Sequence, residues 1–227
     1  MTTTAIIVAA GSGSRFKSDT PKQFLEINGK SVLAHTLERF EAAPSVSCVV
    51  LVLAADLTDF FDIGPYPKLM HVVAGGTTRA RSVGNGLAMV PRDTEIVAVH
   101  DGARPLVTVD EIERTIAKAK ATGAACLVAP VTDTIKSVRG EEIADTLNRD
   151  KLRRALTPQA FKIEVLKKAF EGVELNEAVT DECYLVEKLG HPIAIVEGSP
   201  RNIKITHLED LILAEALLNS ELETRNS

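Results

Sequence analysis

Strand-like and helix-like segments alternate along most of this chain, and this alternation constrains the fold more than any other feature. Short apolar runs typical of buried strands occupy residues 5–9, 48–53, 71–73, 96–100, 124–129 and 192–196. Amphipathic stretches typical of helices lie between most of them, at residues 32–41, 81–89, 109–121, 163–170 and 208–218. This pattern predicts an α/β fold, in which helices flank both faces of a mostly parallel sheet.

The length and composition predict one ordinary globular domain rather than two. The 227 residues can bury a sizeable core, and 45% of them are hydrophobic and 25% charged. We find no repeat or long linker, so we assign residues 1–227 to a single domain. The formal net charge of −5 argues against general nucleic-acid binding. No apolar run approaches the ~20 residues of a membrane-spanning helix, so we expect no membrane association.

The first residues and the cysteines favour a cytoplasmic protein. Residues 1–4 lead directly into the first strand, without the basic and longer apolar segments of a signal peptide. Cys48, Cys126 and Cys183 are far apart and form no CxxC pair. We therefore interpret them as reduced, structural residues.

One segment departs from the alternation and resembles a β-hairpin. Residues 132–138 and 143–148 alternate β-forming and polar side chains, and Arg139-Gly140 can form the turn between them. An isolated hairpin is only marginally stable in water. We therefore expect this protruding arm, at about residues 131–151, to pack on another surface. A second copy of the chain is the simplest candidate, and the alternative is the arm's own domain.

The turn after the first strand has the features of a phosphate site. Residues 6–8 lead into small residues at 9–14, and the cations Arg15 and Lys22 follow. Small residues let the backbone and its N–H groups approach a ligand closely. Two cations add the charge that phosphates require. The segment predicts a site for a phosphorylated nucleotide, and the alternative is two solvated loop cations.

Two commoner nucleotide-binding motifs are incomplete here. Gly11 and Gly13 begin a G-x-G-x-x-G fingerprint, but Phe16 occupies its last position, which disfavours a dehydrogenase-type dinucleotide binder. The tripeptide at 29–31 is similar to the end of a P-loop, yet Phe24 stands where that motif needs glycine. We interpret residues 28–31 as a turn and a helix cap.

An aspartate follows the predicted strand at 96–100. In open α/β sheets ligands bind at the carboxyl ends of strands, and there Asp101 can hold a magnesium ion that also binds phosphate oxygens. The alternative is that Asp101 caps a turn. Arg104 can hold Asp101 in place or reach the substrate. We interpret His100, inside the strand, as a packed side chain rather than a metal ligand.

Further polar segments lie at the ends of other predicted elements. Gly75-Gly76 precedes a helix that carries Ser82, which suits either an anion- or base-binding loop or an ordinary tight turn. Thr180-Asp181-Glu182 resembles a helix N-cap. Polar residues also occur at 156–159 and 201–206, where a lone Lys204 would ordinarily be solvated.

Together these segments resemble the cytidylyltransferases that make 4-diphosphocytidyl-2-C-methyl-D-erythritol in non-mevalonate isoprenoid biosynthesis. The similarity runs through almost the whole chain, and its most specific parts are Asp133-Thr134-Ile135-Lys136, Leu156-Thr157-Pro158-Gln159 and Asn202-Ile203-Lys204. It implies a Rossmann-like nucleotidyltransferase fold that transfers CMP from CTP to 2-C-methyl-D-erythritol 4-phosphate, with magnesium, and releases pyrophosphate. It also implies a homodimer whose subunits exchange the arm.

The resemblance assigns roles to individual residues. The catalytic cations would be Arg15, Lys22, Arg149 and Lys204. The nucleotide would contact Ala9, Ala10, Gly11, Gly13, Gly76, Ser82 and Asp101, and Asp101 would also bind the metal. The methylerythritol phosphate would contact Arg104, Thr134, Arg149, Thr157 and Lys204. Thr77 stands where some relatives have an aspartate near the nucleotide sugar, so we predict no ribose contact at that position.

There are two alternative hypotheses for the function. A ribitol-5-phosphate cytidylyltransferase of the same fold would use the same chemistry with a different acceptor pocket. A noncatalytic nucleotide-binding module would have little reason to hold Arg15, Lys22, Asp101, Arg149 and Lys204 together. The choice between the two acceptors depends on the resemblance alone.

Overall fold

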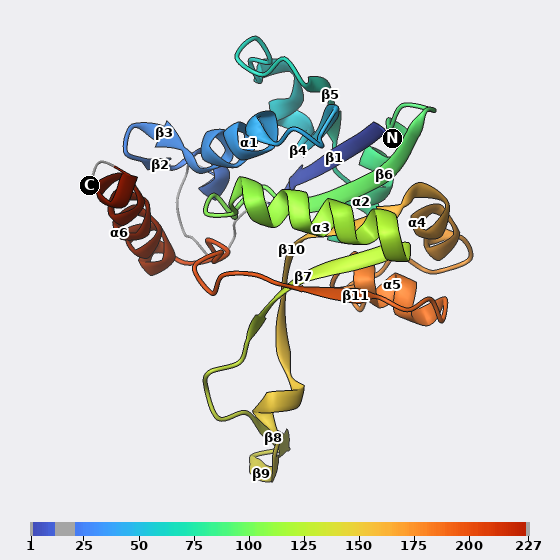
Figure 1. Ribbon diagram of the computed structural model, residues 1–227, viewed down its shortest axis with the longest axis vertical. Coiled ribbons are helices and arrows are strands. Elements are labelled where there is room, and N and C mark those ends of the chain that lie inside the picture. Colours follow the sequence, from blue (N-terminus) through green and yellow to red (C-terminus); the bar gives the residue numbers. More distant parts are fainter. Residues whose placement is uncertain (1, 12–20, 226–227) are drawn as a thin grey trace.

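A central seven-stranded sheet organises the computed structural model, which describes residues 2–11 and 21–225. Figure 1 shows this sheet with its strands in the order β11-β7-β10-β6-β1-β4-β5. The strands are β1 (Thr2–Ala9), β4 (Cys48–Leu53), β5 (Leu69–Ala74), β6 (Thr94–Asp101), β7 (Ala124–Pro130), β10 (Arg153–Lys162) and β11 (Ala194–Glu197). All neighbouring strands pair in parallel except β10, which runs antiparallel to both β6 and β7. The predicted mostly parallel α/β fold is confirmed.

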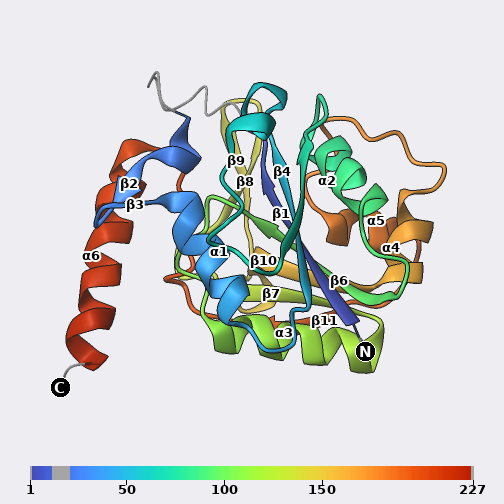
Figure 2. The same ribbon diagram turned by 90° about the horizontal axis from the view of Figure 1, so that it is seen from above.

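Helices cover both faces of the sheet, as Figure 2 shows. On one face, α1 (Val32–Ala42) and α3 (Val109–Thr122) bury apolar side chains against the strands. On the other face lie α2 (Arg79–Ala88), α4 (Ile163–Phe170) and α5 (Glu182–Lys188). The short hairpin of β2 (Glu26–Ile27) and β3 (Lys30–Ser31) packs with α6 (Leu208–Arg225) in a third cluster at the side of the sheet. Short 3₁₀ turns complete the order, at Lys22–Phe24, Ala55–Phe60 and Arg149–Lys151.

Local signals in the sequence set the ends of two of these helices. The Ser31 side chain accepts a hydrogen bond from Ala34 N at the start of α1. Thr108 and Glu111 form a reciprocal capping box at the start of α3, which satisfies backbone donors that a helix cannot pair internally. Gly123 ends α3 with φ 94°, a conformation that favours glycine. The cap at Ser31 confirms the helix cap predicted at residues 28–31.

Strand β10 was not predicted from the sequence. Residues 156–159 read as a polar segment between elements, whereas these four residues are buried inside the sheet. Polar side chains are tolerated there because they are paired: Thr157 hydrogen-bonds to His100, and Gln159 bonds to both Asp181 and the backbone of Cys183. These partners lie far away in sequence, so a local pattern does not reveal them.

The predicted hairpin is present and projects away from the domain (Figure 1). It consists of β8 (Lys136–Arg139) and β9 (Glu142–Thr146), which pair only with each other. Val138 and Ile143 are 69% and 67% exposed. Apolar side chains on a hairpin that its own domain leaves uncovered are suited to contact with another surface.

Within the described part of the chain, no helix combines the length and the apolar character needed to cross a membrane.

Candidate active site

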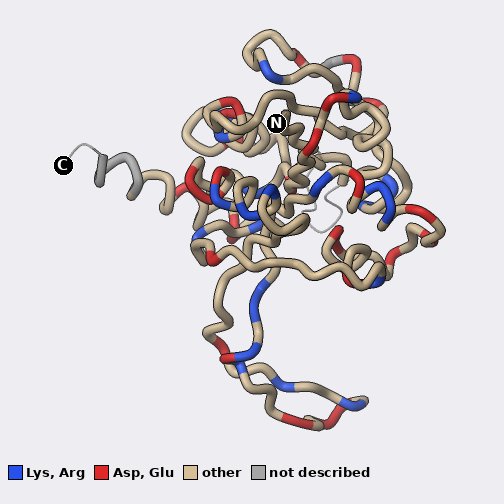
Figure 3. The backbone as a smooth tube through the Cα atoms, turned by 45° about the vertical axis from the view of Figure 1, so that its right-hand side comes forward, with Lys and Arg blue, Asp and Glu red and all other residues tan. Residues whose placement is uncertain are grey.

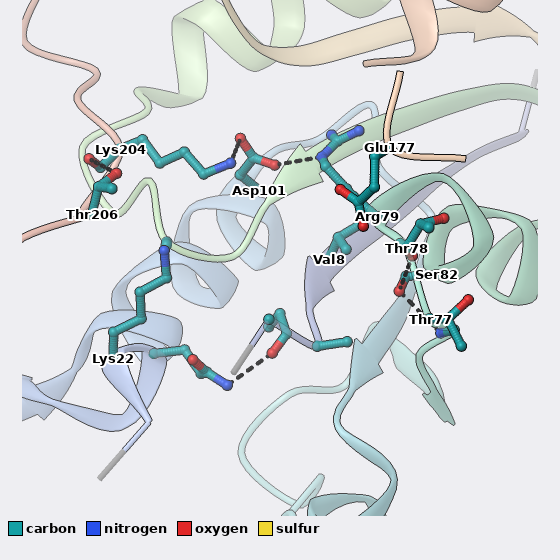
Figure 4. Close-up of a pocket in the computed structure, with 16 residues that line it drawn as sticks. Val8, Lys22, Thr77, Thr78, Arg79, Ser82, Asp101, Glu177, Lys204 and Thr206 are labelled. Carbon is teal, nitrogen blue, oxygen red and sulfur yellow. Dashed lines mark hydrogen bonds and ion pairs between the residues drawn. The ribbon is translucent and has the colours of Figure 1, made fainter. Parts of the chain in front are cut away.

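A pocket of about 480 Å³ opens at the carboxyl ends of β1 and β6. Its walls come from the loop after β1, the turn at Lys22–Phe24, the start of α2, the end of β6 and the segment before α6. Most of the predicted nucleotide site lines it, namely Ala9, Ala10, Gly11, Gly76, Ser82 and Asp101. The predicted cations Lys22 and Lys204 line it as well, and Figure 4 shows both. This is the position where open α/β sheets bind ligands.

Small residues let the loops under the pocket pack closely. A Cβ on Gly75 would lie 2.3 Å from the Cβ of Ala10, and one on Gly102 would lie 2.8 Å from that of Ala9. A Cβ on Gly11 would meet no described atom within 4 Å. Glycine at position 11 therefore leaves room for a ligand to approach the backbone.

Asp101 is the electrostatic centre of the pocket. Its Oδ1 lies 3.1 Å from Arg79 Nε, and its Oδ2 lies 3.2 Å from Arg104 Nε and 3.0 Å from Lys204 Nζ. Burial by itself would raise the pKa of Asp101, but the charges of these cations outweigh burial and hold that pKa well below its ordinary value. Asp101 is therefore ionised and held by cations from three parts of the chain.

Arg79 is fixed by a second carboxylate behind the pocket. Its Nη1 lies 2.6 Å from Oε1 of Glu182, a residue with no exposed surface. Burial by itself would lower the pKa of Arg79, but the negative charges of Glu182 and Asp101 outweigh burial and raise that pKa above its ordinary value. The guanidinium therefore stays charged. Burial raises the pKa of Glu182 against the opposing charge of Arg79. This buried bridge orients Arg79 toward Asp101.

A network of polar groups supports Asp101 from below. His100 Nε2 donates to the Arg104 carbonyl at 3.2 Å, so Nδ1 accepts from Thr157 Oγ1 at 3.0 Å. The same Oγ1 accepts from Asp101 N at 3.1 Å, and Asn202 Nδ2 donates to the Thr157 carbonyl at 2.9 Å. Burial lowers the pKa of His100 to about 3. His100 is therefore a neutral, packed side chain, as predicted.

Backbone contacts position Lys22 next to the segment that carries Lys204. Its Nζ donates to the Ile205 carbonyl at 2.9 Å, and Ile205 N donates to the Ala103 carbonyl at 2.8 Å. The neighbouring Gln23 is buried and donates to the Ala9 carbonyl at 2.9 Å. These bonds tie together three loops that are distant in sequence.

The other predicted residues fall into three groups. Arg104 and Thr157 touch Asp101 as described. Thr134 and Arg149 are exposed on the arm, where Arg149 Nη1 donates to the Thr132 carbonyl at 2.8 Å, and neither lines the pocket of its own chain. Arg15 and Gly13 lie outside the described residues.

Three residues of this region, Arg79, Glu182 and Glu177, were not predicted from the sequence as part of the site. Arg79 and Glu177 line the pocket. A signal for Arg79 was present, because a cation in the first turn of a helix opposes the helix dipole and needs a compensating anion. Glu182 was interpreted only as part of a helix start, and nothing local separates that role from a buried ion pair.

The whole chain is similar to one family of enzymes. A statistical model of the family described as 2-C-methyl-D-erythritol 4-phosphate cytidylyltransferase matches residues 3–220. A relative with that name from Desulforamulus reducens is 42% identical over 94% of each chain, and one from Syntrophus aciditrophicus is 43% identical over 96% of each.

Solved structures agree with these sequence matches. The 4-diphosphocytidyl-2C-methyl-D-erythritol synthase of Anaerococcus prevotii superposes with a TM-score of 0.84 and 31% identity, over 96% of this chain and 98% of its own. The cytidylyltransferase of Thermus thermophilus gives 0.76 and 34%, over 96% and 98%.

This chain belongs to the 2-C-methyl-D-erythritol 4-phosphate cytidylyltransferase family. The family identified from the sequence motifs is confirmed, and the protein is a nucleotidyltransferase. The ribitol-5-phosphate alternative is not favoured, since the family and the relatives reported above all carry the methylerythritol name.

The neutral state of His100 makes stability depend on pH. Its folded pKa of about 3 lies below its ordinary 6.5, so the unfolded chain takes up the proton first as the pH falls. The contribution of His100 to stability is complete above pH 6.5 and is lost progressively as the pH falls toward 3. Relative to His100→Asn, the wild type should lose about 2 kcal/mol of unfolding free energy between pH 7 and pH 5.

Urea denaturation of both proteins at a series of pH values measures this difference. The comparison with the variant removes the contribution of the carboxylates, which both proteins share. Parallel curves for the two proteins between pH 7 and pH 5 would contradict the assignment of a neutral His100.

Proposed function

We propose that this protein transfers the cytidylyl group of CTP to 2-C-methyl-D-erythritol 4-phosphate, giving 4-diphosphocytidyl-2-C-methyl-D-erythritol and pyrophosphate. The observation that carries the proposal is the composition of one pocket in a chain of this family. A loop of small residues, two lysines and an ionised aspartate meet there from four separate parts of the sequence. Such a pocket suits a ligand with a flat base and a chain of phosphates.

The reaction needs charge stabilisation more than proton transfer. A phosphate oxygen of methylerythritol phosphate attacks the α-phosphorus of CTP, and the bond from that phosphorus to the β-phosphate bridging oxygen breaks. Pyrophosphate leaves with the electron pair of that bond. A phosphate monoester is largely ionised at neutral pH, so it acts as a nucleophile without a base. This agrees with the site described above, in which the buried His100 is neutral and hydrogen-bonds to Arg104 and Thr157.

Cations of the pocket would stabilise the negative charge that gathers on the triphosphate. Lys22 reaches the pocket from the turn after the first loop, and Arg15 belongs to the same proposal through the family resemblance. Lys204, on the segment to which Lys22 is hydrogen-bonded, would bind the phosphate of the acceptor once that anion competes for it with Asp101. Holding both anions in line removes much of the entropic cost of their encounter.

Asp101 suits a magnesium site on the condition that substrate phosphates and water supply the other ligands of the ion. No group of three or more metal-binding side chains gathers among the described residues. Magnesium is, however, commonly held by one or two carboxylates together with substrate phosphates and water. Asp101 would hold it here while sharing its oxygens with the surrounding cations. The ion would supply neutralisation of phosphate charge.

We also propose that the arm acts on a second copy of the chain. Arg149 and Thr134 are polar, exposed and remote from their own pocket, and Val138 and Ile143 are uncovered apolar side chains on the same arm. An arm exchanged in a two-fold dimer would bury the apolar pair and bring Arg149 and Thr134 to the partner's pocket. We keep the cytoplasm as the proposed location, because all three cysteines are free and buried.

Replacing Lys22 by alanine tests the proposed reaction. We expect pyrophosphate release from CTP and methylerythritol phosphate in the wild type, with ribitol 5-phosphate used far less well. Lys22→Ala should lower turnover by about 10²–10³-fold while the fold remains intact, because one donor to the transition state is lost. The matched control is Lys30→Ala, which removes an exposed lysine paired with Glu38 outside the pocket. Near-normal turnover in Lys22→Ala would remove this lysine from the mechanism.

Mixing two inactive variants tests the exchanged arm. Lys22→Ala lacks a pocket residue and Arg149→Ala lacks an arm residue, so each should be nearly inactive alone. In a mixed dimer with exchanged arms, one of the two sites is complete. Equal amounts allowed to exchange subunits should therefore recover about a quarter of the wild-type activity. Mixed dimers, verified by two different affinity tags, that recover no activity would show that each site is built within one chain.

A further inference from the structure

Glu177 places a carboxylate in a pocket otherwise dominated by cations. It belongs to the loop between α4 and α5, and its side chain points from this loop into the pocket in Figure 4. Among the described residues, no hydrogen bond or ion pair reaches this carboxylate. Arg79, which lines the same wall, is engaged by Asp101 and Glu182 instead. The negative charge of Glu177 is therefore unneutralised where a polyanion is expected to bind.

The loop that carries Glu177 is anchored on both sides of this residue. Before it, the Leu175 carbonyl accepts a hydrogen bond from Thr78 Oγ1 at 3.0 Å, next to the pocket wall. After it, Ala178 N donates to Asn176 Oδ1 at 3.0 Å, and Val179 is buried in the core. These contacts fix the backbone of Glu177 relative to the start of α2. The backbone therefore places Glu177 at the pocket, where its exposed side chain is open to a ligand.

The charge of Glu177 restricts which part of a nucleotide can lie beside it. A carboxylate repels phosphate groups, which suit the side of the pocket with Lys22, Lys204 and Asp101. In Figure 4, Glu177 lies between Asp101 and Ser82, which is hydrogen-bonded to Gly76 in the loop for which base binding is one of the expected roles. In any nucleoside triphosphate the ribose joins the base to the phosphates. Its hydroxyl groups are hydrogen-bond donors that a carboxylate accepts well, as acidic residues do in dinucleotide-binding folds.

We propose that Glu177 accepts hydrogen bonds from the ribose hydroxyl groups of the nucleotide and so selects ribonucleotides over deoxyribonucleotides. This inference deepens the proposed function, on which it rests. Thr77 is neutral and Asp101 is engaged by three cations, so Glu177 is the carboxylate that remains for the sugar in the described lining of the pocket. The proposal makes Glu177 a specificity residue: it binds the nucleotide and takes no part in bond breaking.

The test compares CTP with 2′-deoxy-CTP and 3′-deoxy-CTP as substrates for three proteins. These are the wild type, Glu177→Ala and Glu174→Ala, and the last is a matched control from the same loop that does not line the pocket. The wild type and the control should prefer CTP to at least one deoxy analogue by about 10-fold or more in kcat/KM, since a hydrogen bond to a charged group is lost. Glu177→Ala should lose this preference through a raised KM for CTP, with kcat and the use of that analogue little changed.

Each outcome bears on one claim. If the wild type and Glu174→Ala turn over CTP with methylerythritol phosphate but Glu177→Ala keeps the full preference for CTP, the role of Glu177 is wrong and the proposed function stands. If Glu177→Ala binds all three nucleotides more tightly by the same factor, Glu177 only repels phosphate, and the proposal is also wrong. If neither the wild type nor the control uses CTP, the proposed function itself fails.

Discussion

The site depends on keeping one ionised carboxylate, that of Asp101, among three cations at the end of a central strand. Burial of a charge without partners would be costly, and the pKa of such a group would shift until it was neutral. Arg79, Arg104 and Lys204 prevent this, each reaching Asp101 from a different segment. In turn, Glu182 holds Arg79, and the Asn202 carbonyl holds Arg104 at 2.8 Å. The packing of distant segments and the chemistry of the pocket are therefore one set of interactions.

The charges in this network match the task of a nucleotidyltransferase. The Asp101 carboxylate pairs with Lys204 and Arg79, so these two cations remain ordered without a bound anion. Under the proposed function, phosphate groups that enter would compete with Asp101 for Lys204, which would keep the cost of rearrangement low. Figure 3 shows that acidic and basic residues are interspersed over the rest of the molecule, in keeping with its net charge of −5.

Much of the fold could be predicted because its signals are local. The apolar runs at β1 and β4, the caps at Ser31 and Thr108 and the turn at Gly140 all depend on neighbouring residues. Strand β10 could not be predicted in this way, because its buried polar residues are paired with groups far away in sequence. The same holds for the site. Lys22 and Asp101 follow recognisable strand ends, whereas the partnership of Arg79 with Glu182 joins residues 103 positions apart. The position of Glu177 in the pocket also depends on tertiary packing, since its loop has no regular secondary structure.

Under the proposed function, one chain alone would not form a complete site, because the arm would contribute its polar residues to a second copy. Its sequence pattern predicted a hairpin, and the pocket of the same chain does not include its polar residues. A dimer with exchanged arms would explain both the uncovered apolar side chains and the distance of Arg149 from the pocket. In that arrangement, assembly would be a condition for activity.

The most direct test of the central claim is a crystal structure of the protein with CTP and magnesium. We expect that the triphosphate lies between Lys22 and Asp101, with magnesium bound to the Asp101 carboxylate and Arg79 still bridged to Glu182. A triphosphate bound elsewhere on the molecule, with the Asp101–Lys204 ion pair undisturbed, would contradict it.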